Sequence, residues 1–413
     1  MNINKERIEN DFSKILRISS TEFGCTRLSY SKEDKKVRKY LEGQLLNIGA
    51  DYREDSVGNI RAMYNPDKLI TKSLLIGSHI DTVPNGGKYD GLTGVLCGLE
   101  VLRVIKENNI KLINPLELII FAEEEGSNFG VTMIGSKYIT NKINKEDLKN
   151  LYTDNMISAY DYLQSNGFNI NSGNDFSIHK DKELGMIELH VEQGGILDNE
   201  RISVGIVDDI AGMNSIKVTI KGKANHAGTT PMSMRNDSLL AASEMIYKLS
   251  QFLPKYETAV ATVGKIQVKP NASNVIAGEV IFFIDIRDVI QRNIDVITKN
   301  IEQLCFSLAK SNKVEIEIIT IGSSKVVNMN KILVDILEGQ AKATNLNYKK
   351  MNSGAVHDNA MLTDIIPTAM IFVPSIDGIS HSPYEDTNIE DIVVGADLLL
   401  NSSLKIVSNL FND

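Results

Sequence analysis

The sequence predicts an α/β protein that carries a second, inserted α+β domain. Two apolar runs, SLLIGSHI at 73–80 and PLELIIFA at 115–122, are typical of strands buried on both faces of a parallel or mixed sheet, and a helix predicted at 92–108 separates them. From about 202 to 321 the order changes to strand, helix, two strands, helix, strand, which indicates a ferredoxin-like sandwich. The apolar strand TAMIFV at 368–373 resumes the first pattern and could rejoin the first sheet.

The elements follow from local patterns along the chain. Helices are predicted at 4–19, which is amphipathic, and at 31–48, where apolar residues recur at helical spacing. The strand MIELHV ends in a Gly-rich turn. In the inserted segment the strands are IKVTIKG, TAVATVGKIQV, EVIFFIDIR and VEIEIITI, and the helices are 237–253 and 289–310. We therefore expect one domain from 1–208 and 325–413, interrupted by another at 209–324.

Composition narrows the class of protein. The length of 413 residues suits two or three domains at about 150 residues each. Acidic residues outnumber basic ones by 53 to 44 with no long basic run, so we expect neither nucleic acid nor a membrane surface as partner. Three widely spaced cysteines favour a reducing cytoplasm. We expect neither export nor membrane insertion, because the N-terminal segment is not apolar and the chain has no long apolar window.

Histidines and acids cluster at the ends of the predicted buried strands. His79 and Asp81 end one strand, and a turn containing Gly86 and Gly87 could return Asp90 towards His79. Such a set suits zinc, manganese or cobalt, although a solvated loop would show the same residues.

Three further segments repeat this placement. PLELIIFA runs into Glu123, Glu124 and Glu125, whose mutual repulsion a metal ion would offset, leaving one glutamate free as general base. His190 ends MIELHV two residues before Glu192, and His381 follows TAMIFV. An exposed acidic turn is the alternative for the glutamates, but the combination favours a dinuclear metal site.

The inserted segment offers polar groups of another kind, namely His226, Asn274 and Arg287. Arg287 ends an apolar strand, where its guanidinium could bind a substrate carboxylate in a bidentate manner. A structural ion pair with Asp285 or Asp288 is the alternative.

Seven motifs in order resemble the hydantoinase/carbamoylase branch of the M-twenty metallopeptidase family. They are SHIDTVPNGGKYDG, FAEEEGSNFG, ELHVEQG, GKANHAGTTPM, NVIAGEVIFFIDIRD, SGAVHDN and FVPSIDGISHSP, and they cover nearly the whole chain. The resemblance implies a mixed-sheet hydrolase domain with a dinuclear metal site, and a ferredoxin-like lid that mediates homodimerisation.

The resemblance also implies roles for individual residues. Two divalent ions (Zn, Mn, Co or Ni) would be bound by His79 and His190, by Glu125 and His381, and by Asp90 as the bridge. Asp81 would orient His79, and Glu124 would be the general base. Substrate would be held by Gln193, His226, Asn274, Arg287 and the backbone at Gly354, with His226 reaching the site of a partner subunit and assisting catalysis there.

Two positions depart from the pattern of this branch. Asn128 stands where the family usually has Arg. Any role of that cation in loop anchoring or substrate choice is therefore in doubt for this chain. Val356 replaces a Gly near the expected pocket and could narrow it.

The implied reaction is hydrolysis of a small ureido substrate. Water would attack the carbamoyl carbon of an N-carbamoyl-L-amino acid, releasing ammonia, carbon dioxide and the free amine. Allantoate amidohydrolase is the next alternative, followed by β-ureidopropionase or a related metallo-dipeptidase. A catalytically silent binding module would require a missing ligand or base, and none is missing.

Overall fold

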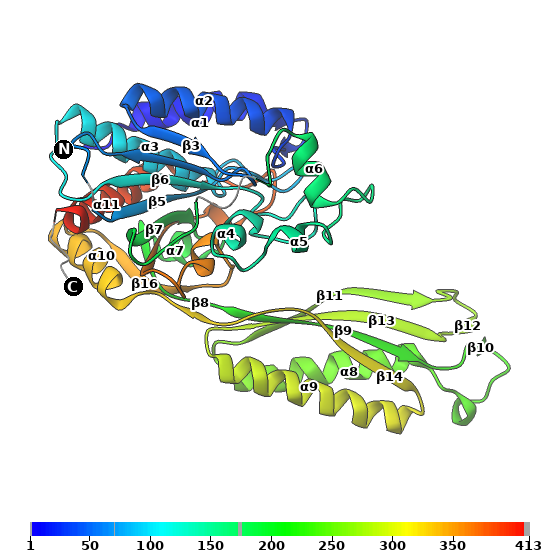
Figure 1. Ribbon diagram of the computed structural model, residues 1–413. Helices are drawn as coiled ribbons and strands as arrows, with labels where there is room; N and C mark the ends of the chain where they lie inside the picture. The colour runs from blue at the N-terminus through cyan, green and yellow to red at the C-terminus, as the bar shows by residue number, and fades with distance from the viewer. Residues whose placement is uncertain (1, 70, 172–175, 409–413) are drawn as a thin grey trace. The chain divides into compact units, whose positions relative to one another are not determined.

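The computed structural model describes residues 2–69, 71–171 and 176–408, and the chain forms two compact units (Figure 1). The larger unit comprises Met1–Asp208 and Asn328–Asp413, and the smaller comprises Asp209–Val327. None of the helices in the described ranges combines the length and apolarity needed to cross a bilayer.

The larger unit is built on a mixed sheet with the order β15-β8-β17-β7-β5-β6-β4-β3, and β16 pairs with β8. The central strands β17, β7, β5 and β6 are parallel, whereas β8, β4 and β3 run antiparallel to their neighbours. The bounds are β3 Asp51–Glu54, β4 Ile60–Tyr64, β5 Ser73–His79, β6 Leu116–Phe121, β7 Glu183–Val191, β8 Val204–Ile210, β15 Val327–Asn328, β16 Tyr348–Ser353 and β17 Thr368–Val373. The prediction of an α/β fold with a mixed sheet is confirmed.

Helices α3 (Leu92–Glu107) and α11 (Ile389–Val407) pack on the central strands, and α1 (Lys5–Ser19) and α2 (Lys32–Ile48) pack in turn against α3. Helix α3 lies very close to the sheet at Gly98, where a Cβ would come within 2.6 Å of Leu118 Cδ1. This close approach holds the middle of α3 against β6. The remaining short elements are β1 Ser20–Thr21, β2 Gly24–Cys25, α4 Ile134–Ile139, α5 Lys145–Leu148, α6 Ala159–Ser165, α7 Ile196–Glu200, α10 Lys331–Ala343, η3 Asp358–Met361 and η4 Ile376–Gly378.

The smaller unit is a four-stranded antiparallel sheet with the order β11-β13-β9-β14. Alternate residues of β13, from Val280 to Ile286, are buried in a core that includes residues of α8 and α9. The bounds are β9 Gly212–Lys221, β10 Asn225–His226, η1 Met232–Met234, α8 Ser238–Phe252, η2 Leu253–Lys255, β11 Val260–Lys269, β12 Val275–Ile276, β13 Glu279–Asp288, α9 Gln291–Asn312 and β14 Glu315–Ser324. The main elements therefore occur in the predicted order of strand, helix, two strands, helix, strand.

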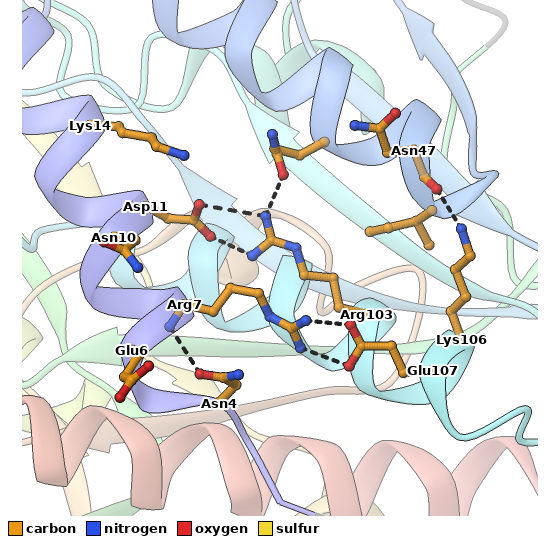
Figure 2. Close-up of a pocket in the computed structure, with 12 residues that line it drawn as sticks. Asn4, Glu6, Arg7, Asn10, Asp11, Lys14, Asn47, Arg103, Lys106 and Glu107 are labelled. Carbon is orange, nitrogen blue, oxygen red and sulfur yellow. Dashed lines mark hydrogen bonds and ion pairs between the residues drawn. The ribbon is translucent and has the colours of Figure 1, made fainter.

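A surface pocket of about 710 Å³ lies among α1, α2 and α3 (Figure 2). Its arginines are already paired: Arg7 bonds Glu107, and Arg103 bonds Asp11. None of the residues that the sequence predicts as functional lines it. The candidate site is elsewhere, at the ends of the parallel strands.

Candidate metal centre

The candidate ligands lie at the carboxyl ends of the adjacent parallel strands. His79 is the last residue of β5, His190 is the penultimate residue of β7, and Glu125 follows β6. His381 lies in the loop after β17, and Asp90 lies in the turn between β5 and α3. The parallel arrangement brings these ends to one edge of the sheet, where α/β proteins usually bind ligands.

Asp90 is the centre of the cluster. Its Oδ1 lies 3.1 Å from His190 Nε2 and 3.5 Å from His79 Nε2, and its Oδ2 lies 3.1 Å from His381 Nε2. Glu125 Oε2 lies 3.4 Å from the same His381 nitrogen. Two groups with suitable spacing for a metal ion result, His79 with Asp90 and His190, and Asp90 with Glu125 and His381. They share Asp90.

The two buried histidines are oriented from their Nδ1 atoms. His79 Nδ1 lies 3.1 Å from the Asp81 carbonyl oxygen and 3.5 Å from Asp81 Oδ1, and His190 Nδ1 lies 2.9 Å from the Val191 carbonyl oxygen. With the Nδ1 proton donated to these oxygens, each Nε2 keeps a lone pair directed at the cluster. Asp81 therefore contacts the Nδ1 side of the His79 ring.

A glycine makes room for one ligand. Gly91 has φ of +63°, and a Cβ there would come within 2.4 Å of His79 Cε1 and Nε2. Only glycine adopts this conformation without strain and leaves the imidazole in place.

The three consecutive glutamates have three different environments. Glu124 Oε2 lies 3.8 Å from His79 Nε2, and Glu125 faces His381. Glu123, with φ of +54°, is fully buried and bonds Asn128 instead. The left-handed backbone at Glu123 separates the directions of these side chains.

The charges of the cluster fit a bound cation. Burial raises the pKa of Glu124 well above its ordinary value and that of Glu125 to about 7. Although burial opposes it, hydrogen bonds from three imidazoles hold the pKa of Asp90 well below its ordinary value, and the bond to Asp90 raises the pKa of His381 to about 9. Among the described residues, no lysine or arginine forms an ion pair with these carboxylates. Imidazole and carboxylate donors together suit divalent transition metals.

Glu385, which no sequence motif singles out, also contributes to the geometry of the site. Its Oε1 accepts hydrogen bonds from the Tyr89 and Asp90 backbone N–H groups, and its Oε2 accepts one from Ser380 Oγ at 2.9 Å. It thus joins the turn that carries Asp90 to the loop that carries His381. The only signal in the sequence is an acid shortly after His381 in SHSPYED.

His357 and Glu188 are further neighbours of the cluster that were not among the predicted site residues. The His357 ring contacts the His190 ring with centroids 4.6 Å apart, and Glu188, His190 and His357 form a third group with metal-compatible spacing. Glu188 accepts bonds from Ser78 Oγ and the Asn359 N–H. His357 lies in the SGAVHDN motif, which could have pointed to it.

Of the expected substrate residues of the larger unit, Gln193 contacts the cluster directly. Gln193 Nε2 donates to Asp90 Oδ2 at 2.8 Å and lies 3.3 Å from His381 Nε2. Gly354 follows β16 and is exposed. Glu192, which repeats the His-x-acid pattern, accepts from the Ile196 and Leu197 N–H groups and so caps α7.

The expected substrate residues of the smaller unit lie beyond one end of its four-stranded sheet, in and beside the two-stranded sheet of β10 and β12, and at the opposite end of the four-stranded sheet. His226 pairs with Val275, and the Ala227 N–H donates to the Asn274 carbonyl, so His226 and Asn274 are neighbours. The Gly228 N–H donates to His226 Nδ1 at 3.0 Å, which leaves the proton on an exposed Nε2.

Arg287 lies at the other end. Its Nε donates to Asp285 Oδ1 at 2.8 Å, so the ion pair that was the structural alternative is formed, with the Arg287 side chain 36% exposed. At about 3.4 Å per residue, β13 spans roughly 27 Å from Glu279 to Arg287. His226 lies beyond the Glu279 end, because Lys221, which precedes it, pairs with Glu279.

Comparison with known proteins gives consistent results. A family model described as Peptidase family M20/M25/M40 matches residues 75–404. An N-carbamoyl-L-amino-acid amidohydrolase of Pseudomonas sp. (strain NS671) is 35% identical over 410 residues, which is 98% of each chain. An allantoate amidohydrolase of Escherichia coli (strain K12) is 34% identical over 377 residues, 91% of each chain. A solved amidase of the hydantoinase/carbamoylase family from Burkholderia multivorans superposes with a TM-score of 0.92 at 30% identity, covering 99% of both chains.

Proposed function

The chain belongs to peptidase family M20/M25/M40, and from this premise we propose that it is a metal-dependent amidohydrolase that cleaves the ureido C–N bond of N-carbamoyl-L-amino acids. The observation that carries the proposal is the pair of candidate metal-ligand groups that share Asp90 beside Glu124. The full-length similarity to an N-carbamoyl-L-amino-acid amidohydrolase supports the substrate class.

Two divalent ions would be held by the two groups around Asp90, one by His79 and His190 and the other by Glu125 and His381. Mixed imidazole and carboxylate ligation accepts zinc, manganese, cobalt or nickel. When bound, such ions polarise a carbonyl oxygen and make a water molecule more acidic.

Glu124 would act as general base and then as general acid. Its carboxylate lies beside the cluster without being a member of either ligand group, so it remains free to take a proton from the attacking water. The same carboxyl group would pass that proton to the leaving nitrogen. Asp81 would keep His79 oriented through its Nδ1.

Substrate would be bound by groups of both units. Arg287 suits the α-carboxylate, because its guanidinium can make two parallel hydrogen bonds to a carboxylate, as its bond to Asp285 already shows for one nitrogen. His226 would donate its Nε2 proton to the oxyanion that develops at the ureido carbonyl, with Asn274 beside it. Gln193 and the backbone at Gly354 would contact the substrate from the larger unit.

We also propose that two copies form a homodimer through the smaller unit. A small ureido substrate cannot contact both Arg287 and His226 of one chain, because roughly 27 Å of β13 separates them. A second copy could supply His226. Strand β11 lies at an edge of the sheet and consists of exposed and half-buried residues, so it could pair with its counterpart in a symmetric dimer. The three buried, unbridged cysteines suit the cytoplasm.

Allantoate is the second candidate substrate. It shares the ureido group and the carboxylate, and the similarity to an allantoate amidohydrolase over 91% of the chain favours it. The same residues would serve either reaction.

The test is ammonia release from N-carbamoyl-L-amino acids and allantoate by protein loaded with each of the four metals. We expect hydrolysis of at least one N-carbamoyl-L-amino acid with a kcat/KM above that for allantoate. A higher kcat/KM for allantoate would make allantoate the preferred substrate. If the protein binds two ions but hydrolyses neither kind of substrate, the ureido assignment is refuted.

A further inference from the structure

Asn128 holds the carboxylate of Glu123 at both oxygens. Its backbone N–H donates to Glu123 Oε1 at 2.7 Å, and its side-chain Nδ2 donates to Glu123 Oε2 at 2.6 Å. The same Nδ2 donates to the Ser29 carbonyl at 3.0 Å. One neutral side chain thus ties the start of the loop after β6 to the segment before α2.

The backbone of Glu123 is held as well. Its N–H donates to Ser29 Oγ at 2.8 Å, and its carbonyl accepts from the Ile134 N–H at 3.1 Å. Its φ of +54° is a conformation that non-glycine residues adopt only when their surroundings impose it. Since Glu123 is completely buried, these partners take the place of water as hydrogen-bonding groups.

The direction of the next two side chains depends on this conformation. Glu124 and Glu125 follow Glu123 directly, and they face His79 and His381 respectively. If Glu123 relaxed to a negative φ, the chain after it would change direction, and both carboxylates would leave their present positions.

We propose that Asn128 is a positioning residue for the reaction, acting through the Glu123 carboxylate to fix Glu124 and Glu125 in the site. This inference rests on the proposed function. Asn128 would also anchor the loop in place of the arginine that is usual at this position. Its side-chain amide has two N–H donors and can do so without a charge.

The first test replaces Asn128 with Asp, which has nearly the same shape but sets a carboxylate against Glu123. At saturating metal and well below the melting temperature, we expect kcat to fall at least about tenfold with KM within threefold of wild type, because a displaced base slows the chemical step. Asn150→Asp is the matched control, since Asn150 is exposed and its Nδ2 donates to the Glu146 carbonyl of the same turn, far from Glu123 in the sequence.

The second test exchanges donor and acceptor in the double variant Glu123→Gln/Asn128→Asp. The Gln amide can donate to the new Asp, and its oxygen can still accept from the backbone N–H at 128, so we expect kcat at least about threefold above that of Asn128→Asp. If Asn128→Asp does not fold, Asn128→Ala, which keeps only the backbone donor, takes its place with the same expected loss.

The outcomes separate this inference from the proposed function. A lowered melting temperature with unchanged kcat, or no gain in the double variant, would make Asn128 a purely structural residue and overturn the inference. Metal titration provides a readout that needs no substrate: we expect Asn128→Asp to bind the metal supported by Glu125 at least about tenfold more weakly. If the wild type is inactive but Asn128→Asp still binds metal more weakly, only the proposed function is refuted. If Asn128→Asp binds metal as tightly as the wild type, the positioning role is refuted.

Discussion

Replacing Gly91 with Ala tests the geometry of the candidate metal centre most directly. The new Cβ would lie 2.4 Å from His79 Cε1 and Nε2, so the ring must retreat by about 1 Å to restore an ordinary contact. The ring is only 2% exposed, and its Nδ1 contacts Asp81, so it cannot retreat without losing that contact. The backbone at Gly91, with φ of +63° and ψ of −50°, lies outside the left-handed helical region and would add about 1–3 kcal/mol of strain for a residue with a Cβ.

We expect this displacement to lower kcat/KM by about 100-fold, since an error of about 1 Å in a reacting group has an effect of that order. Metal content by mass spectrometry and ammonia release are the assays. Gly43→Ala is the matched control: Gly43 is an exposed residue of α2, and a Cβ added there would meet nothing within 4 Å, so the change should raise stability by about 0.5–1 kcal/mol with unchanged activity. If Gly91→Ala keeps wild-type metal content and kcat/KM, the assignment of His79 as a ligand is wrong.

Four further predictions address the other residues of the site. Removal of metal by a chelator should abolish activity, and a divalent transition metal should restore it; activity untouched by complete removal would exclude metal dependence. Glu124→Gln should lower kcat by at least about 100-fold with metal content preserved, and near-normal turnover would refute its role as base. Arg287→Lys should raise KM about tenfold without a large change in melting temperature, whereas instability with unchanged kinetics would make the Asp285 ion pair its function. Mixed dimers of Glu124→Gln and His226→Ala subunits should regain activity, because one site would receive an intact base and an intact histidine; no recovery after verified subunit exchange would place His226 in its own subunit's site or in none.

The strands at the centre of the fold could be predicted because burial on both faces produces continuous apolar runs. The run at 73–80 corresponds to β5 Ser73–His79, and the run at 368–373 is β17. Strand β4 could not be recognised in this way, since it contains Arg61. That side chain is buried and bonds Glu117 at 2.6 Å and Glu183 at 2.9 Å, partners that are distant in sequence. A charge in a strand looks like a surface residue until its partners are known.

The same limit applies to the site. Residues such as His79 and His190 stand out because they interrupt apolar strands at their ends. Glu385 does not, because its importance lies in a bond to the Asp90 N–H across 295 positions of the chain. The position of Glu385 also explains the glycine at 87, since a Cβ there would lie 2.0 Å from the Glu385 carboxyl carbon. The sequence predicts the groups that carry the chemistry, whereas the groups that hold them are defined by long-range contacts.

The run of three glutamates shows why side-chain type alone does not assign a role. By sequence, Glu123 and Glu124 are equally available as the general base. In the structure Glu123 is fully buried and both its oxygens accept hydrogen bonds from Asn128, while Glu124 lies beside His79. Moving Glu123 into the site would break both of these bonds and change its backbone conformation. It therefore cannot replace Glu124, and Glu124→Gln should leave the enzyme with no second base.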